Sequence, residues 1–189
     1  MDKPAMIAIV FDSGTGRTEK VAEKIKEGAT KVEGTEAKLF TSQEAIDALD
    51  ELDGFDAIIF GSPTYMGSVS AQFKRFMDTT GQKWMEQKWK DKLASGFTNS
   101  SGIIGDKSNV VTTLQIFAGQ HSMIWVSQGT APGEQSEDGE MLNRLSSWSG
   151  LMTQTEPKAE HPHPADLATA VSFGKRVAEV TRRWVGNAK

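Results

Sequence analysis

Three hydroxyl side chains and two glycines follow the first strongly apolar stretch of the chain, in the segment Ser13-Gly14-Thr15-Gly16-Arg17-Thr18. Glycine lets the backbone curl and approach a ligand closely. Where such a loop opens a helix, the N–H groups of the first turn point at an anion and the helix dipole favours its negative charge. The segment therefore predicts a phosphate-binding loop made of Ser13, Thr15, Gly16, Arg17 and Thr18.

Other phosphate motifs do not fit this segment. A Walker loop needs a Lys after its last glycine, but Gly16 is followed by Arg17, and a dinucleotide fingerprint needs a third glycine where Glu19 stands. A receiver-type phosphoacceptor needs an Asp at the end of the third expected strand, which instead ends in Gly61 and Ser62. A terminal monophosphate is the best remaining ligand. The alternative is an ordinary capped turn, because Ser and Thr are common helix N-caps.

A second candidate segment follows the third expected strand and consists of Pro63, Thr64, Tyr65, Met66 and Gly67. A flat ring system needs an apolar or aromatic wall and donors along its polar edge. Tyr65 and Met66 supply such a wall, and Thr64 and the neighbouring peptides supply donors. Taken alone, the segment fits equally well a turn in which Tyr65 covers the core. Beside a phosphate loop, it favours the isoalloxazine ring of FMN.

A third candidate segment follows the fourth expected strand and contains Thr98, Asn99, Ser100, Gly102 and Gly105. Its polar side chains and N–H groups suit the pyrimidine edge of a flavin. Reduced flavin carries charge near N1, so donors at that edge raise its reduction potential. The intervening Ile103 and Ile104 predict a hydrophobic side for a substrate.

Five apolar segments alternate with helical patterns along the chain. Strands are expected at Ala5–Phe11, Glu36–Thr41, Asp56–Gly61, Lys92–Phe97 and Met123–Ser127. Helices are expected around residues 21–32, 43–52, 69–77, 108–121 and 167–185. This alternation predicts an α/β, flavodoxin-like three-layer α/β/α sandwich with a five-stranded parallel sheet in the order 2-1-3-4-5. That order brings the three candidate segments to one switch point at the carboxyl ends of the strands.

The stretch 130–165 shows no clear strand, and it is longer than an ordinary connection of about 4–6 residues. Its part from Gly133 to Glu140 is polar. We expect a long loop or lid within a single FMN-binding domain that spans residues 1–189. His161 and His163 resemble a pair of metal ligands, but two ligands without a third make no site, so a solvated linker is expected.

The composition narrows the function classes. The 189 residues contain no Cys, which excludes disulfides, Cys-based zinc sites, iron–sulfur clusters and a thiol nucleophile. The net charge of -4 argues against a nucleic-acid partner. No apolar run approaches the ~20 residues of a membrane helix, so we expect no membrane partner and a cytoplasmic location.

The pattern Ser/Thr-x-Thr-Gly-x-Thr at residues 13–18 resembles the phosphate signature of flavodoxin-like FMN proteins. The resemblance extends to the WrbA family of NAD(P)H:quinone oxidoreductases over roughly residues 5–128. It is carried by Asp56–Thr64, Gly67, Gln72-Phe73, Phe76, Asp78, Thr80-Gly81, Trp84 and Lys92–Ser95. The resemblance implies non-covalent FMN, NAD(P)H as electron donor, two-electron reduction of a quinone, and a homo-oligomer (dimer or tetramer).

The resemblance also implies residue roles. Residues 13 and 15–18 match the family's phosphate loop, residues 63–67 its isoalloxazine loop, and Thr98, Asn99, Ser100 and Gly105 its third loop. His121 matches the active-site histidine, and Trp84 a tryptophan near the neighbouring subunit's flavin. The chain departs from the family where Ile103 and Ile104 replace glycines, and in the stretch 130–165.

Two functions remain in competition at this point. The first is an FMN-dependent NAD(P)H oxidoreductase that reduces quinones or related acceptors, in which His121 could orient or protonate the acceptor. The second is a flavodoxin-type electron carrier, which would use the same phosphate loop. A carrier docks through a strongly charged face, so the modest net charge and the extra stretch 130–165 favour the enzyme. A flavin-binding module without enzymatic activity has no independent support.

Overall fold

The protein is described here by a computed structural model that covers residues 3–186. Its sheet has the parallel order β2-β1-β3-β5-β6. The strands of this path are β1 (Ala5–Phe11), β2 (Thr35–Thr41), β3 (Ala57–Tyr65), β5 (Leu93–Ser100) and β6 (Ile124–Trp125). The two-residue strand β4 (Ser68–Val69) pairs only with β3 and lies off this path. Counted in chain order, the five strands of the path therefore have the predicted flavodoxin-like order 2-1-3-4-5. The predicted fold class is confirmed.

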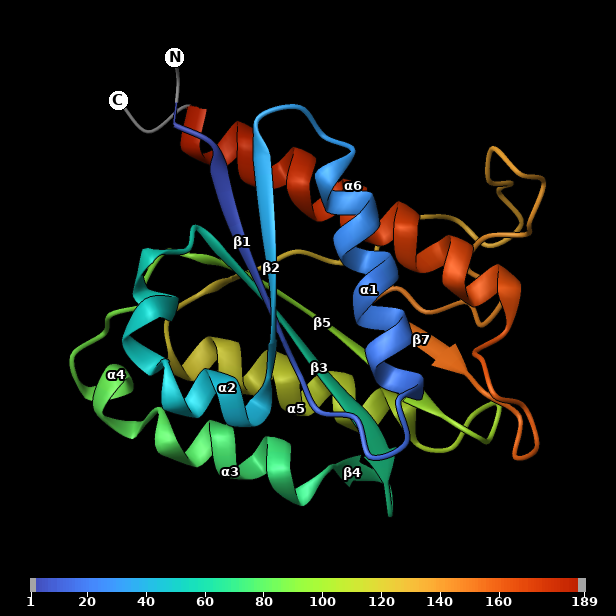
Figure 1. Ribbon diagram of the computed structural model, residues 1–189, viewed down its shortest axis with the longest axis horizontal. Coiled ribbons are helices and arrows are strands. Elements are labelled where there is room, and N and C mark those ends of the chain that lie inside the picture. The colour runs from blue at the N-terminus through green and yellow to red at the C-terminus, as the bar shows by residue number, and fades with distance from the viewer. Residues whose placement is uncertain (1–2, 187–189) are drawn as a thin grey trace.

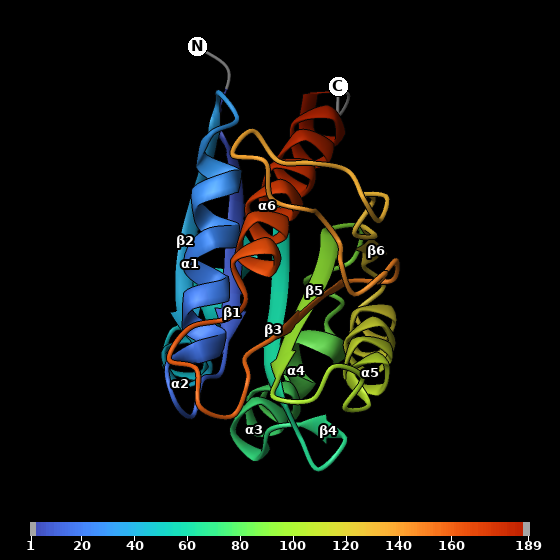
Figure 2. The same cartoon turned by 90° about the vertical axis from the view of Figure 1, so that its right-hand side faces the viewer.

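Helices cover both faces of the sheet. One layer contains α1 (Arg17–Thr30) and α6 (Pro164–Gly186), which lie side by side in Figures 1 and 2. The other contains α2 (Ser42–Asp47), the 3-10 helix η1 (Leu49–Gly54), α3 (Ala71–Thr79), α4 (Gly81–Met85) and α5 (Lys107–Gln120). The helix predicted around residues 43–52 is thus two shorter elements, α2 and η1. No helix within residues 3–186 is long and apolar enough to span a membrane.

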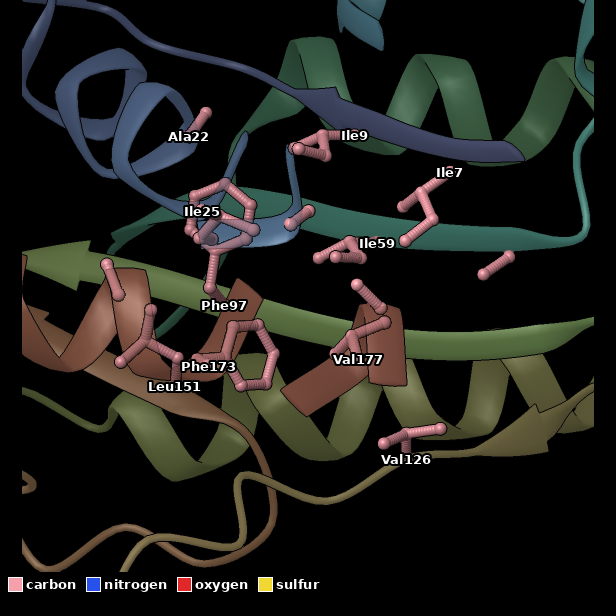
Figure 3. Packing of buried hydrophobic residues seen from close by; sticks show 14 of the residues in the cluster. Ile7, Ile9, Ala22, Ile25, Ile59, Phe97, Val126, Leu151, Phe173 and Val177 are labelled. Atoms are coloured by element: carbon pink, nitrogen blue, oxygen red, sulfur yellow. The ribbon is translucent and has the colours of Figure 1, made fainter. Parts of the chain in front are cut away.

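The buried strands explain these two layers. Successive side chains of a strand point to opposite faces, so a strand buried on both faces is apolar throughout. In β1, Ile7 and Ile9 pack in one core with α1 and α6, whereas Ala8 and Val10 pack in the other core with α3 and α5. Figure 3 shows the first core, where Ile25 of α1 and Phe173 of α6 meet the strand side chains.

Two glycines let α1 and α6 approach each other closely. A Cβ atom added to Gly28 would lie 1.9 Å from the carbonyl oxygen of Val171, and one added to Gly174 would lie 2.0 Å from that of Ile25. No side chain fits at either position. The helix pair behind β1 therefore depends on glycine at both contact points, and it fixes where the first turn of α1 stands relative to the sheet.

The edge of the sheet beside β5 differs from the prediction. The expected strand Met123–Ser127 forms a ladder only at Ile124 and Trp125, which pair with Leu93 and Ala94. Farther along β5, a further parallel strand, β7 (Leu151–Gln154), pairs with Phe97–Ser100. The prediction that 130–165 contains no strand is wrong, because its Leu-Met-Thr-Gln segment has too little apolar alternation to stand out in the sequence.

The stretch 130–165 is therefore not one loop. Asn143 is buried and donates from Nδ2 to the carbonyls of Thr130 and Ser147 at 2.8 and 2.9 Å. These hydrogen bonds hold the start and the end of the segment before β7 close together. The part around the Gln135–Met141 bridge projects at the upper right of Figure 1, away from the carboxyl ends of the strands. The connection from β7 to α6 returns to that end, where Arg17 donates to the carbonyl of Pro157.

Candidate functional site

A pocket of about 300 Å³ opens at the carboxyl ends of β1, β3 and β5. These strand ends and the loops after them lie together at the lower right of Figure 1. The lining residues are Thr15, Arg17, Thr18, Pro63, Thr64, Tyr65, Met66, Gly67, Asn99, Ser100, Ser101, Gly102 and Gly105. Residues of all three predicted segments thus meet in one cavity, whose volume is at the lower end of the range of about 300–1,000 Å³ for small-molecule sites.

The first loop has backbone N–H groups that are not used within the described part of the fold, and it reaches the pocket through Thr15. Gly16 adopts a φ of 78°, a left-handed conformation that suits glycine, and it directly precedes α1. Within residues 3–186, the N–H groups of residues 13–16 donate to no other backbone carbonyl, and the first-turn N–H groups of a helix have no acceptor inside it. Ser13 has a local task, since its hydroxyl accepts the N–H of Glu19 at 3.2 Å. Ser13 and Gly16 shape the loop but do not line the pocket.

The second loop is a tight hairpin turn. Thr64 pairs with Val69 and Tyr65 with Ser68, which leaves Met66 and Gly67 as a two-residue connection. Their φ angles are 49° and 76°, and positive φ at both central residues is typical of a type I′ turn. The turn and the ring-binding interpretation are therefore compatible. The turn holds Met66 fully in solvent and Tyr65 half exposed at the rim of the pocket.

The second and third loops are joined by hydroxyl contacts below the pocket floor. The Oγ1 atoms of Thr64 and Thr98 lie 2.8 Å apart, so Thr98 supports Thr64 and does not line the cavity itself. The Oδ1 atom of Asn99 accepts the hydroxyls of Thr153 and Thr155 at 2.9 and 3.1 Å. With Oδ1 engaged on the side of β7, the amide NH₂ group of Asn99 remains the donor available to a ligand.

The structure does not bring His121 to the pocket. It follows α5 at the opposite end of the sheet, it is 2 % exposed, and its ring packs 4.5 Å from that of Trp89. The prediction that His121 is a catalytic residue of this site is corrected accordingly: within one chain it is a core residue. A histidine at a helix end looks the same in sequence whether it faces a ligand or the core.

The hydrogen bonds of His121 define its protonation. The hydroxyl of Thr80 donates its only hydrogen to the carbonyl of Met77 at 2.7 Å, so the Nε2–H of His121 donates to Thr80 Oγ1 at 2.9 Å. The buried Nδ1 atom has no partner among the described residues. Burial lowers the pKa of His121 to about 4, because a second proton at Nδ1 would place an unpaired charge in the core.

Sequence reasoning missed two kinds of site residue. Ser101 lines the pocket and could have been included with its neighbours Ser100 and Gly102. Gln154 and Lys107 contact the third loop from behind, and nothing in the local sequence marks them. Arg17 lines the pocket, and its guanidinium also donates to the carbonyl of Pro157 at 3.3 Å. The connection after β7 therefore borders the first loop.

The donors in this pocket fit FMN. The N–H groups ahead of α1, with the hydroxyls of Thr15 and Thr18 and the charge of Arg17, suit a phosphate monoester. The close approach at Gly14 supports the fit, since a Cβ atom there would lie 2.4 Å from the Tyr65 hydroxyl. There is thus no room for a side chain at Gly14, where Tyr65 meets the first loop. The backbone N–H groups of that loop remain available to a ligand.

Known proteins resemble most of the chain. The model of the NADPH-dependent FMN reductase family matches residues 17–138. A flavodoxin, FldP, from Pseudomonas aeruginosa is 37% identical over 91% of this chain and 94% of that protein. An NAD(P)H dehydrogenase (quinone) from Archaeoglobus fulgidus is 32% identical over 95% of this chain and 98% of its own length. The crystal structure of a flavodoxin, WrbA-like protein from Agrobacterium tumefaciens superposes with a TM-score of 0.75, at 37% identity over 95% of this chain and 98% of that one.

The matched range 17–138 contains the second and third loops of the pocket and the strands that carry them. The relatives cover nearly the full length of both chains. Together with the observed fold and the donor set of the pocket, these matches show that the chain belongs to the NADPH-dependent FMN reductase family of flavodoxin-like proteins.

Proposed function

We propose that this chain binds FMN non-covalently and is an oxidoreductase that reduces quinones or related small-molecule acceptors with NAD(P)H. One observation carries the proposal: the first loop, whose N–H groups have no backbone acceptor within residues 3–186, lines through Thr15, Arg17 and Thr18 the same pocket as the Pro63–Gly67 turn and the loop after β5. Donors for a phosphate, a wall for a flat ring and polar groups for the edge of that ring are thus brought together in one pocket. The quinone dehydrogenase from Archaeoglobus fulgidus supports the reaction class.

Each loop has a distinct role in this proposal. The phosphate is held by the N–H groups of residues 13–18, the hydroxyls of Thr15 and Thr18, and Arg17. Tyr65 and the Met66–Gly67 turn flank the ring, while Asn99, Ser100 and the N–H groups near Gly102 and Gly105 face its pyrimidine edge. When bound, FMN supplies two-electron chemistry, taking hydride from a nicotinamide and passing electrons to an acceptor.

The rim of the pocket supports an apolar acceptor. Met66, Ile103 and Ile104 are exposed by 103%, 63% and 81%, and they stand on the second and third loops around the opening. Solvent-exposed apolar side chains grouped at a pocket mouth commonly mark a binding surface. A planar, apolar ring such as a quinone matches that rim.

A flavodoxin-type electron carrier is the second candidate. It is favoured by one specific observation, the 37% identity to a protein named flavodoxin from Pseudomonas aeruginosa. It requires the same FMN pocket, so the two candidates differ only in what reduces and reoxidises the flavin.

Anaerobic mixing separates the candidates. NADH and then NADPH are added to the FMN-loaded protein, and flavin absorbance is followed against the same protein reduced with dithionite. Rapid loss of oxidised-flavin absorbance with either nucleotide, followed by its return on addition of a quinone, is the expected result. Bound flavin that is reduced by dithionite but by neither nucleotide would identify a carrier instead. Protein that retains no FMN would refute both candidates.

We further propose that residues 1–189 form a single FMN-binding domain that works in the cytoplasm as a homo-oligomer; the outermost boundaries fall on residues 1–2 and 187–189, outside the described part. Trp84 and Met85 on α4 are exposed by 45% and 74%, which supports an assembly surface away from the chain's own pocket. Light scattering coupled to size-exclusion chromatography checks the assembly. A monomer at micromolar concentration would contradict it.

A further inference from the structure

Three successive carbonyl groups of the third loop are tied to buried side chains behind the pocket. Gln154 of β7 donates from Nε2 to the carbonyl oxygen of Ser101 at 3.0 Å. Lys107, the first residue of α5, donates from Nζ to the carbonyl oxygens of Gly102 and Ile103, the latter at 2.8 Å. Because these donors come from the protein interior, the three carbonyls point inward, away from the opening of the pocket.

The planarity of the peptide determines where the adjacent N–H groups point. In a trans peptide the N–H of one residue is antiparallel to the carbonyl of the preceding residue, and the described chain contains no cis peptide. Inward carbonyls at residues 101–103 therefore direct the N–H groups of Gly102, Ile103 and Ile104 outward. Within residues 3–186, these three N–H groups donate to no other backbone carbonyl, so they remain free for a ligand.

The two donors belong to a buried charged cluster. Lys107 is 1% exposed and Gln154 is 8% exposed. The backbone N–H of Gln154 donates at 2.7 Å to the carboxylate of Asp166, which also pairs with the guanidinium of Arg144 at 2.8 Å. The cations Lys107 and Arg144 and the carboxylate of Asp166 thus lie behind the third loop, on the side away from the opening of the pocket. The excess positive charge adds to the field of the outward N–H groups.

Lys107 is poorly placed if its only task is to stabilise the fold. A cation in the first turn of a helix opposes the positive end of the helix dipole. Burial also lowers the pKa of Lys107 to about 8, against the ordinary value of 10.5, which shows that its charged form is disfavoured in the folded protein. A side chain that costs stability while fixing a ligand-facing loop is typical of a functional position.

We propose that Lys107 and Gln154 are positioning residues that hold loop 101–104 with its N–H groups directed outward, that of Gly102 at the lining of the pocket, so that the pocket binds reduced, negatively charged FMN more tightly than oxidised FMN. The proposal rests on the proposed function for the identity of the ligand. Neither residue touches the ligand. Lys107 contributes through both its hydrogen bonds and its charge, whereas Gln154 contributes through its hydrogen bond alone.

The test uses Lys107→Met and Gln154→Met, which keep the length of each side chain and remove its donors. The matched control is Lys90→Met, an exposed lysine before β5 at the other end of the sheet. The dissociation constant of oxidised FMN is measured by fluorescence titration, and the midpoint potential of bound FMN by equilibration with reference dyes. Together the two values give the ratio of the affinities for reduced and oxidised FMN.

For Lys107→Met we expect that ratio to fall by about tenfold or more, the scale of one hydrogen bond with charge assistance. Gln154→Met should lower it less, and Lys90→Met should leave it unchanged. Equal losses of affinity for the two redox forms would overturn the proposal, because they would indicate a purely structural support. If Lys107→Met does not fold, Gln154→Met decides, and an unchanged ratio there would refute the positioning role.

A second readout does not require FMN at all. Backbone ¹⁵N relaxation of the ligand-free protein should show increased mobility at residues 101–104 in both variants and not in Lys90→Met. Unchanged mobility would show that Lys107 and Gln154 do not hold the loop. Wild-type protein that fails to bind FMN would refute the proposed function and, with it, the redox preference, while the relaxation data would still report on the loop itself.

Discussion

The hydroxyl of Tyr65 lies directly against Gly14, so that a Cβ atom added to Gly14 would be 2.4 Å from the Tyr65 oxygen. Tyr65 belongs to the turn after β3 and Gly14 to the loop after β1. The contact joins the proposed phosphate loop to the proposed ring wall. A side chain at position 14 would therefore displace Tyr65, so the position of the ring wall depends on glycine in the first loop.

Replacing Gly14 with Ala should weaken FMN binding by about tenfold, since the methyl group forces the Tyr65 ring away from the position that the turn sets. Fluorescence titration with FMN measures the effect. Gly54→Ala is the matched control, because a Cβ atom at Gly54 meets nothing within 4 Å. Equal affinity in Gly14→Ala and wild type would mean that Tyr65 does not flank the ligand.

The double variant Thr15→Val and Thr18→Val should lower FMN affinity strongly, at roughly 1–3 kcal/mol for each lost hydrogen bond to a charged phosphate. The same variant should bind riboflavin, which lacks the phosphate, about as well as wild type does. Thr112→Val on the exposed face of α5 provides the control. Unchanged FMN affinity in the double variant would refute the assignment of the phosphate loop.

Gly28→Ala and Gly174→Ala should each destabilise the fold by about 1–3 kcal/mol or more, because the added methyl meets backbone atoms that cannot rotate away. Their Cβ atoms would lie 1.9 and 2.0 Å from carbonyl oxygens of the facing helix. Urea denaturation followed by circular dichroism measures the free energy of unfolding. Gly119→Ala, in a helix but with nothing within 4 Å of its Cβ, should not destabilise the protein. Stability equal to wild type at positions 28 and 174 would contradict the close packing of α1 and α6.

His121 should make the protein less stable in mild acid. Its pKa is lowered from 6.5 to about 4 by burial, so between those pH values the unfolded chain takes up a proton that the folded protein does not. The contribution of His121 is therefore fully present above pH 6.5 and is lost as the pH falls towards 4.

The variant His121→Phe isolates this effect, because it keeps an aromatic ring beside Trp89 and Phe117 but cannot be protonated. The free energy of unfolding, measured at several pH values from 7 to 4, should decline less steeply in the variant than in wild type. Parallel curves would show that His121 is not the buried titrating group. The variant should also retain NAD(P)H-dependent flavin reduction, and its loss would restore a role for His121 in the reaction.

Much of the site was predictable from local sequence. The hydroxyl- and glycine-rich segment at 13–18 and the Pro63–Gly67 turn are marked by residue types whose backbone preferences act over a few residues. The apolar runs of β1, β3 and β5 predict strands buried on both faces, and the alternation with helices predicts the strand order. That order brings the three loops to one edge, where the lining of the pocket confirms their proximity.

Other features depend on contacts between residues far apart in the chain. β7 completes the sheet edge beside β5 although its four residues have no distinctive pattern, since its pairing depends on the exposed edge of Phe97–Ser100. His121 could be assigned to the core only once the packing of Trp89 and Phe117 was known.

The sequence by itself determined the sheet order and the residue types around the pocket, because strand burial and turn geometry are properties of short segments. Only the tertiary structure decided that His121 is buried in the core, that β7 pairs with the edge of β5, and that Lys107 and Gln154 hold the carbonyls of the third loop inward. The physical reason is that His121 meets Thr80 across 41 positions of the sequence and Gln154 meets Ser101 across 53. No local pattern records which partner will be present at such separations.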